Sequence, residues 1–164
     1  MTDLFEDTRQ MKVLSLWQPW ASLMACGVKL HETRHWSTTH RGAIAIHAAK
    51  TVDIAGAPEQ LCADLFGRWW AKELPRGQVV AIGNLTRCSE AHTVADRLTT
   101  ADLESGNFAH GRYAWRIEDV RQVLRPVFVI GRQGLFNWTP PADLEAHLGP
   151  RLNHAAACTA IGWA

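Results

Sequence analysis

Residues 14–50 read LSLWQPWASLMACGVKLHETRHWSTTHRGAIAIHAAK, and this stretch contains both the order of the first elements and a candidate binding cleft. An alternating run is followed by a turn flanked by Trp17 and Trp20, a short apolar segment, and Gly27. A polar run comes next, with titratable side chains at Lys29, His31, Glu32, Arg34 and His35. Titratable groups interleaved with indoles are typical of a ligand cleft, because a cleft combines apolar walls with a few polar groups.

Composition indicates an ordinary globular protein of 164 residues, 47% hydrophobic and 20% charged. We expect one domain over residues 1–164, with a core at about 12–136 and a C-terminal helical extension at 139–164. The net charge of +1 excludes a globally basic nucleic-acid binder. Any contact to phosphate must therefore be local, and the four Lys and Arg residues against one acid between positions 28 and 50 form the local candidate. A solvated surface explains such a charge run equally well.

The four cysteines are far apart and form no C-x-x-C pair: Cys26, Cys62, Cys88 and Cys158. The first ten residues, MTDLFEDTRQ, contain no apolar signal segment, and no apolar run approaches 18 residues. We therefore expect a cytoplasmic protein with reduced thiols, no membrane span, no cysteine zinc site and no cofactor.

Hydrophobic periodicity predicts six extended segments, at residues 11–16, 30–36, 43–48, 78–86, 112–117 and 120–130. Helices are expected at 21–26, within 51–72, from Thr100, and at 142–148. A turn is expected at Glu118-Asp119, and a tight loop at 131–134. Five or six strands with helices inserted after the first and third predict an α+β protein built on a small mixed β-barrel.

The letters His31-Glu32-Thr33-Arg34-His35 also spell H-E-x-x-H, the zinc-hydrolase motif. That motif requires a helix, which places both histidines on one face. Gly27 ends the preceding helix, and the extended pattern of residues 30–36 favours a strand instead. On a strand the two histidines stand about 13 Å apart, too far for one metal ion. We therefore predict no metal site here.

Read as a strand, residues 30–36 place Glu32, Arg34 and Trp36 on one face. The carboxylate and the guanidinium can pair in a fixed geometry, with Lys29 at the entrance of the strand. This polar floor can bind a base edge or a phosphate, and the indoles of Trp17, Trp20 and Trp36 can supply a stacking wall. The alternatives are an ordinary salt bridge and tryptophans that belong to the core.

Three consecutive segments resemble the ASCH domain family, which is related to the PUA fold. They are L-S-L-W-Q-P-W-A-S-L, G-V-K-x-x-E-T-R-x-W and R-G-A-I-A-I-H-A-A-K, and the second contains the family's G-x-K-x-x-E-x-R element at Gly27, Lys29, Glu32 and Arg34. Residues 111–120 and 126–136 are similar to the closing strands of the family. The resemblance implies a PUA-like barrel whose cleft binds RNA or a modified nucleoside.

The resemblance also implies a possible activity, since the family includes ribonucleases and small amidohydrolases that deacylate N4-acetylcytidine. In those amidohydrolases a Lys acts with a Thr three residues later. Lys29 matches the Lys, whereas Glu32 occupies the Thr position. We therefore leave two functions open: a binding module, or a metal-independent hydrolase with Lys29 as the base and Glu32 beside it. The expected partner in either case is RNA or a nucleoside.

Further binding residues are expected around this cleft, each with a structural alternative. Arg41 precedes a glycine and suits a phosphate contact or a simple turn. His47 ends a buried strand and is a candidate acid or a core histidine. The remaining candidates are Gln18 in the tryptophan-flanked turn, Tyr113 as a hydroxyl donor, and Gln133 at the mouth of the barrel.

Overall fold

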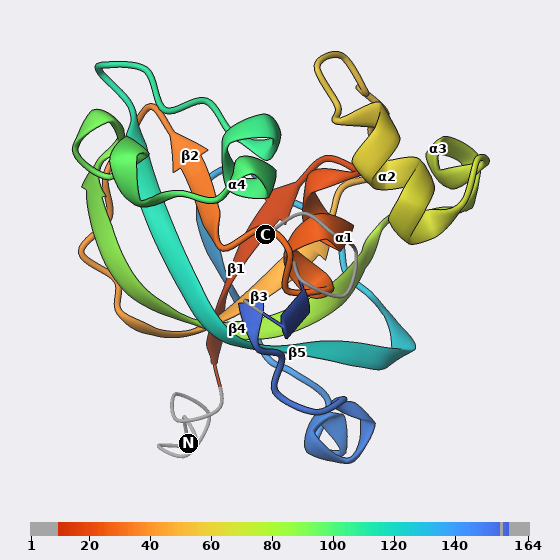
Figure 1. The fold of residues 1–164 in the computed structure, drawn as a ribbon. Helices are drawn as coiled ribbons and strands as arrows, with labels where there is room; N and C mark the ends of the chain where they lie inside the picture. Colours follow the sequence, from red (N-terminus) through yellow and green to blue (C-terminus); the bar gives the residue numbers. More distant parts are fainter. Residues whose placement is uncertain (1–9, 155, 158–164) are drawn as a thin grey trace.

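The computed structural model describes residues 10–154, 156 and 157, and its centre is one six-stranded mixed sheet (Figure 1). The strands are β1 (Met11–Leu16), β2 (His31–Arg34), β3 (Gly42–Ala48), β4 (Gln78–Glu90), β5 (Tyr113–Phe128) and β6 (Leu135–Trp138). The predicted α+β class and the number of strands are confirmed. The helices expected after the first and third strands are present as well.

The sheet is not closed into the barrel that we expected. Its strand order is β2-β5-β4-β3-β1-β6, and within the described residues no pairing joins the two outer strands. Both outer strands have only four residues, and each pairs on one side alone, β2 with β5 and β6 with β1. Because closure of a barrel requires the first and last strands to share a ladder, the sheet stays open.

The pairing of β1 with β3 is parallel and places Ser15 beside His47. A parallel pair needs a long crossover, and the segment between the two strands supplies it with α1 (Trp20–Ala25) and β2. Pro19 precedes the helix, and Gly27, with φ +79°, ends it in the left-handed conformation that glycine tolerates. This crossover carries the tryptophan-flanked turn and the polar run to one end of the sheet.

The turn predicted at Glu118-Asp119 is wrong, because β5 runs through it without interruption. Asp119 takes a φ of +52°, and the β4–β5 register shifts between Ile82 and Asn84. A bulge of this kind bends a strand without ending it, so the polar pair that resembles a turn lies inside a strand. The sixth strand is therefore β6, which follows the predicted loop at residues 131–134.

Three more α-helices follow, and the predicted helical positions in the middle of the chain are confirmed: α2 (Glu59–Phe66), α3 (Trp70–Glu73) and α4 (Thr100–Ser105). The helix expected at 142–148 is a 3-10 helix, Leu144–His147. None of the described helices is long and apolar enough to cross a membrane.

The core has one main cluster between α1 and the sheet, where Met24 packs against Leu14 and Ile46. A second cluster joins α1 to α2, α3 and α4, with Trp70 as its largest fully buried side chain. The second cluster joins α1 to α4, and Figure 1 shows α4 beside β2. The candidate site lies where these elements meet.

Candidate functional site

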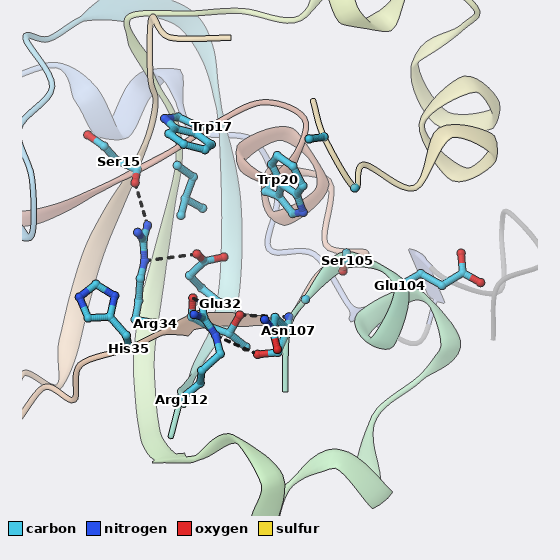
Figure 2. Close-up of a pocket in the computed structure, with 15 residues that line it drawn as sticks. Ser15, Trp17, Trp20, Glu32, Arg34, His35, Glu104, Ser105, Asn107 and Arg112 are labelled. Atoms are coloured by element: carbon cyan, nitrogen blue, oxygen red, sulfur yellow. Dashed lines mark hydrogen bonds and ion pairs between the residues drawn. The ribbon is translucent and has the colours of Figure 1, made fainter. Parts of the chain in front are cut away.

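A pocket of about 530 Å³ lies between the tryptophan-flanked turn, β2, and the segment that follows α4 (Figure 2). This volume is within the range of small-ligand sites. Its walls combine indoles with charged and amide groups, and its main lining side chains are Trp17, Trp20, Glu32, Arg34, Asn107 and Arg112. The structure therefore brings together four of the residues that the sequence assigned to a cleft: both tryptophans, Glu32 and Arg34.

Glu32 occupies the floor of this pocket between two cations. Its Oε2 lies 3.4 Å from Lys29 Nζ, and its Oε1 lies 3.3 Å from Arg34 Nε. The side chain retains 12% exposure, so the carboxylate is fixed but accessible from the pocket. A carboxylate held in this way is a pre-organised acceptor for N–H groups of a ligand.

Lys29 lies beneath the pocket and is completely buried. Its ammonium group donates to the carbonyls of His31 and Ser105, and it pairs with Glu32 as its third partner. An ammonium group has three N–H donors, so these three partners use all of them. Lys29 therefore supports Glu32 from below the pocket. It also connects β2 to the end of α4.

Arg34 forms the opposite side of the floor. Its Nη2 donates to the carbonyl of Ser15 at 2.8 Å, while its Nε faces Glu32. In the part of the chain that the structure describes, its Nη1 has no protein partner. Across the pocket in Figure 2 lie Trp17, which is 47% exposed, and Trp20. The extended reading of residues 30–36 correctly placed Glu32 and Arg34 on one face.

The segment after α4 supplies a wall that the sequence analysis did not identify. Asn107 N donates to Thr33 Oγ1 at 3.2 Å, and Arg112 Nη2 donates to the carbonyl of Thr33 at 2.9 Å. The Asn107 Oδ1 accepts from Ala109 N, and Asn107 lines the pocket. This wall comes from a polar region with no periodicity, so only the structure could show that it reaches β2.

A second pocket of about 720 Å³ adjoins the first and is bordered by Ser15, Trp17, Arg34 and His35, which line both. Two of the predicted binding residues, His47 and Gln133, line this second pocket. Trp36 lines it as well, but its ring also packs edge-on against Trp115, with centroids 4.5 Å apart. Trp36 therefore serves the core as well as the pocket.

His47 forms the floor of the second pocket and is 1% exposed. Its Nε2 lies 2.9 Å from the Val129 carbonyl, which can only accept, so Nε2 carries the hydrogen. Its Nδ1 then accepts from Ser15 Oγ, also at 2.9 Å. Burial lowers the pKa of His47, although its backbone hydrogen bonds oppose the change. The imidazole is accordingly neutral near pH 7.

The H-E-x-x-H motif lies on a strand, as predicted: β2 covers His31–Arg34, and His35 follows it directly. His31 is buried, with Nδ1 3.8 Å from Asp102 Oδ2, whereas His35 is exposed at the border of the two pockets. The Asp102 carboxylate also accepts from Leu30 N at 2.9 Å. Burial alone would raise the pKa of Asp102, but the nearby imidazoles and this hydrogen bond lower it overall.

Besides Lys29, three of the predicted site residues lie outside both pockets. Gln18 is buried and bonds to Ser22 and to the Pro75 carbonyl. Arg41 is exposed and donates to carbonyls of its own loop. Tyr113 packs against the main core cluster.

The six-stranded mixed sheet with few helices is that of an α+β protein with a PUA-like fold. The chain belongs to the ASCH domain family, because the model of the ASCH domain matches residues 14–127. The resemblance seen in the sequence is thereby confirmed, and membership supports a role in RNA binding or hydrolysis. No curated protein matches the sequence.

Solved structures of the same family are similar in fold. The ASCH protein from Zymomonas mobilis is 16% identical, with a TM-score of 0.50, and the match covers 85% of this chain and 93% of that one. A mutant form of the Zymomonas mobilis protein is 15% identical, with a TM-score of 0.49, over 83% of this chain and 94% of that one. At 16% identity, the first of these matches supports the shared fold alone.

Proposed function

We propose that this ASCH domain is a binding module that holds one nucleoside unit of RNA, or a modified nucleoside, in the pocket beside β2. The observation that carries the proposal is the fixed carboxylate of Glu32, held between Lys29 and Arg34 and facing indoles across the pocket. Such an arrangement offers both directional hydrogen bonding and a stacking surface. These are the two interactions by which proteins recognise unstacked bases.

Glu32 and the amide of Asn107 form a donor–acceptor pair that suits the edge of a base. Both side chains line the pocket, Glu32 from β2 and Asn107 from the segment after α4 (Figure 2). Glu32 can accept from an exocyclic amino group, and the Asn107 N–H₂ can donate to the neighbouring ring nitrogen or carbonyl. Cytosine presents this pattern on one edge, so we expect it to bind more tightly than uracil.

Trp17 and Trp20 supply the apolar side of the site. Both indoles line the pocket opposite the polar floor, and Trp17 is 47% exposed although it is a large aromatic residue. An exposed indole beside a polar floor supports a stacking role, which contributes about 1–3 kcal/mol per base.

The alternative, a hydrolase with Lys29 as the base, has weaker support. Lys29 is completely buried, does not line the pocket, and has three hydrogen-bonding or ionic partners. The hydroxyl of Thr33, one residue beyond the position expected in the amidohydrolases, accepts from Asn107 N. A binding role needs neither a free base nor a nucleophile. It therefore agrees better with this geometry.

The test is a binding titration of cytidine, uridine and N4-acetylcytidine, together with a fluorescein-labelled random-sequence RNA octamer. Wild type, Glu32→Gln and the exposed control Glu59→Gln are compared, and each mixture is also analysed for products. We expect Glu32→Gln to weaken cytidine and RNA binding by roughly tenfold, since a hydrogen bond to a charged group contributes about 1.5–3 kcal/mol. Glu59→Gln should bind like wild type.

Equal affinity of wild type and Glu32→Gln for all probes would overturn the proposal. Turnover of N4-acetylcytidine or of the RNA octamer by wild type would favour the hydrolase instead. Both outcomes can be read from the same mixtures.

We also propose a reducing, cytoplasmic location. The described cysteines Cys62 and Cys88 are free thiols, which supports this assignment. Burial raises the pKa of Cys62 to about 12, so this thiol stays protonated and behaves as a core residue.

A further inference from the structure

The second pocket differs from the first in its charge. The first contains two carboxylates, Glu32 and Glu104, whereas no described residue that lines the second is acidic. Three permanently cationic side chains line the second pocket: Arg34, Lys50 and Arg132. A concave site bounded by cations without a compensating carboxylate attracts anions, because low-dielectric walls concentrate the field inside it.

These cations are also available for a ligand. Within the described part of the chain, neither Lys50 nor Arg132 makes a hydrogen bond or ion pair through its side chain. The Nη1 of Arg34 likewise has no described partner, since Glu32 and the Ser15 carbonyl engage only Nε and Nη2. In a structural role these donors would bond to protein acceptors, as the donors of Lys29 do.

The floor and rim of the second pocket are held in place around these groups. Ser15 and His47 are paired across neighbouring strands, and Val129 fixes the ring from the other side. A Cβ at Gly131 would lie 2.7 Å from His47 Cε1, so this loop can rest on the imidazole only because residue 131 is glycine. The loop therefore lies directly against the floor, with Arg132 and Gln133 following as lining residues.

We propose that the second pocket binds the phosphate group of a nucleotide whose base occupies the first pocket. This inference rests on the proposed function and specifies its ligand as a phosphate-bearing nucleotide rather than a free nucleoside. Arg34 connects the two sites, because its Nε faces Glu32 in the first pocket while its guanidinium also lines the second. Arginine suits this position because its planar fork can hold carboxylate and phosphate groups at the same time.

The phosphate has two possible sources, a free mononucleotide and a phosphodiester within RNA. The probes that separate them are cytidine, cytidine 5′-monophosphate, cytidine 3′-monophosphate and the dinucleotide CpC, each titrated calorimetrically into the full chain. Inorganic phosphate is added as a competitor in a parallel series. The variant Lys50→Gln/Arg132→Gln removes two cations without touching Glu32 or Arg34. The matched control Arg68→Gln/Lys72→Gln removes two cations that lie around Trp69, outside both pockets.

We expect wild type to bind at least one of the phosphate-bearing probes roughly tenfold more tightly than cytidine, from two or three charge-assisted contacts. Lys50→Gln/Arg132→Gln should reduce this preference to about twofold or less while leaving cytidine affinity unchanged, and the control should retain it. Preference for CpC over both monophosphates identifies RNA as the source, and the reverse order identifies a free nucleotide.

Two results overturn the inference in different ways. If cytidine binds in a Glu32-dependent manner but phosphate adds no affinity, or if the double variant keeps the preference, the second pocket is not a phosphate site and the proposed function still holds. If neither cytidine nor any phosphate-bearing probe binds to wild type, the proposed function and this inference fail together.

Discussion

Lys29 illustrates how one side chain can belong to a functional motif without touching the ligand. Its ammonium group is completely buried and is satisfied by two carbonyls and by Glu32. A buried cation is costly unless it is paired, and removing one member of such a group leaves the others unsatisfied. The Lys of the G-x-K-x-x-E-x-R element therefore positions the carboxylate on which the proposed site depends.

We predict that Lys29→Met lowers the free energy of unfolding by about 3–5 kcal/mol, because Glu32 and two buried carbonyls lose their partner. Urea unfolding measures the loss. The control Lys72→Met changes an exposed lysine and should cost about 0.5 kcal/mol or less. A Lys29→Met protein as stable as wild type would contradict the supporting role.

His47 provides a second prediction at this scale, through pH. Burial lowers the pKa of His47 in the folded protein, so the unfolded chain, with a pKa near 6.5, binds the proton more readily. Between the unfolded value and the lowered folded value, the unfolded state carries more protons, and stability falls as pH falls. The contribution of this group is fully present above about pH 6.5.

Unfolding titrations of wild type and His47→Gln between pH 7.5 and 5 test this sign. The decline in stability should be steeper for wild type, because the variant lacks the titrating group. The comparison isolates His47, because the two proteins share every other titratable group. Parallel pH profiles for the two proteins would show that His47 is not responsible.

Prediction at the level of residues was successful where a periodic pattern determines the face of a strand on which a side chain lies. The two-residue repeat of a strand over residues 30–36 was enough to place the side chains of Glu32 and Arg34 on one face. It could not show that the Gln18 side chain is hydrogen-bonded to Ser22 and to the Pro75 carbonyl. The partners of a polar side chain depend on which distant segments reach it, and spacing along the chain contains no such information.

At the scale of elements, the long pair β4–β5 organises the molecule. It spans the full length of the sheet and shifts register in three places. Gly83 lies at one of these shifts, where a Cβ would stand 2.6 Å from Ile117 Cγ2. At this position the two strands approach so closely that only glycine fits without displacing Ile117.

Gly83→Ala should destabilise the protein by about 1–3 kcal/mol, because the added methyl group overpacks a buried position. Gly149→Ala is the matched control, since its Cβ would meet atoms at ordinary contact distances of 3.6 Å and more. Thermal unfolding of both variants measures the difference. Equal melting temperatures would show that β4 moves away from β5 without cost.

Most of the elements could be predicted, but β6 was not among the predicted strands. The helices after the first and third strands follow from periodicity and from Pro19, Gly27 and Pro58. The β5 strand was divided in two, because Glu118-Asp119 has turn composition but lies at a bulge. The wall formed by Asn107 and Arg112 was missed, because irregular segments carry no periodic signal.

On the scale of the whole molecule, an almost neutral chain places three cations around one pocket. The net charge is +1, yet Arg34, Lys50 and Arg132 line a pocket with no described acidic residue. Family membership could be read from the residues that position Glu32, and the model match over residues 14–127 confirms it. The same residues could not show whether the sheet closes into a barrel, because closure depends on how the two short outer strands pair.

The most direct test of the central claim is an RNA titration followed by NMR of the tryptophan indole N–H groups. Trp17 and Trp69 are similarly exposed, at 47% and 52%, but only Trp17 lines the pocket beside Glu32. Arg68 and Lys72 lie over the ring of Trp69, so this indole reports non-specific attraction of RNA to a cationic surface.

With the octamer as ligand, we predict saturable shifts of the Trp17 and Trp20 signals in wild type and their loss in Glu32→Gln, with Trp69 unchanged in both. Assignments come from single Trp→Phe variants. Shifts of Trp69 alone, or no shift of Trp17 at saturating RNA, would contradict the claim that this pocket binds a nucleotide.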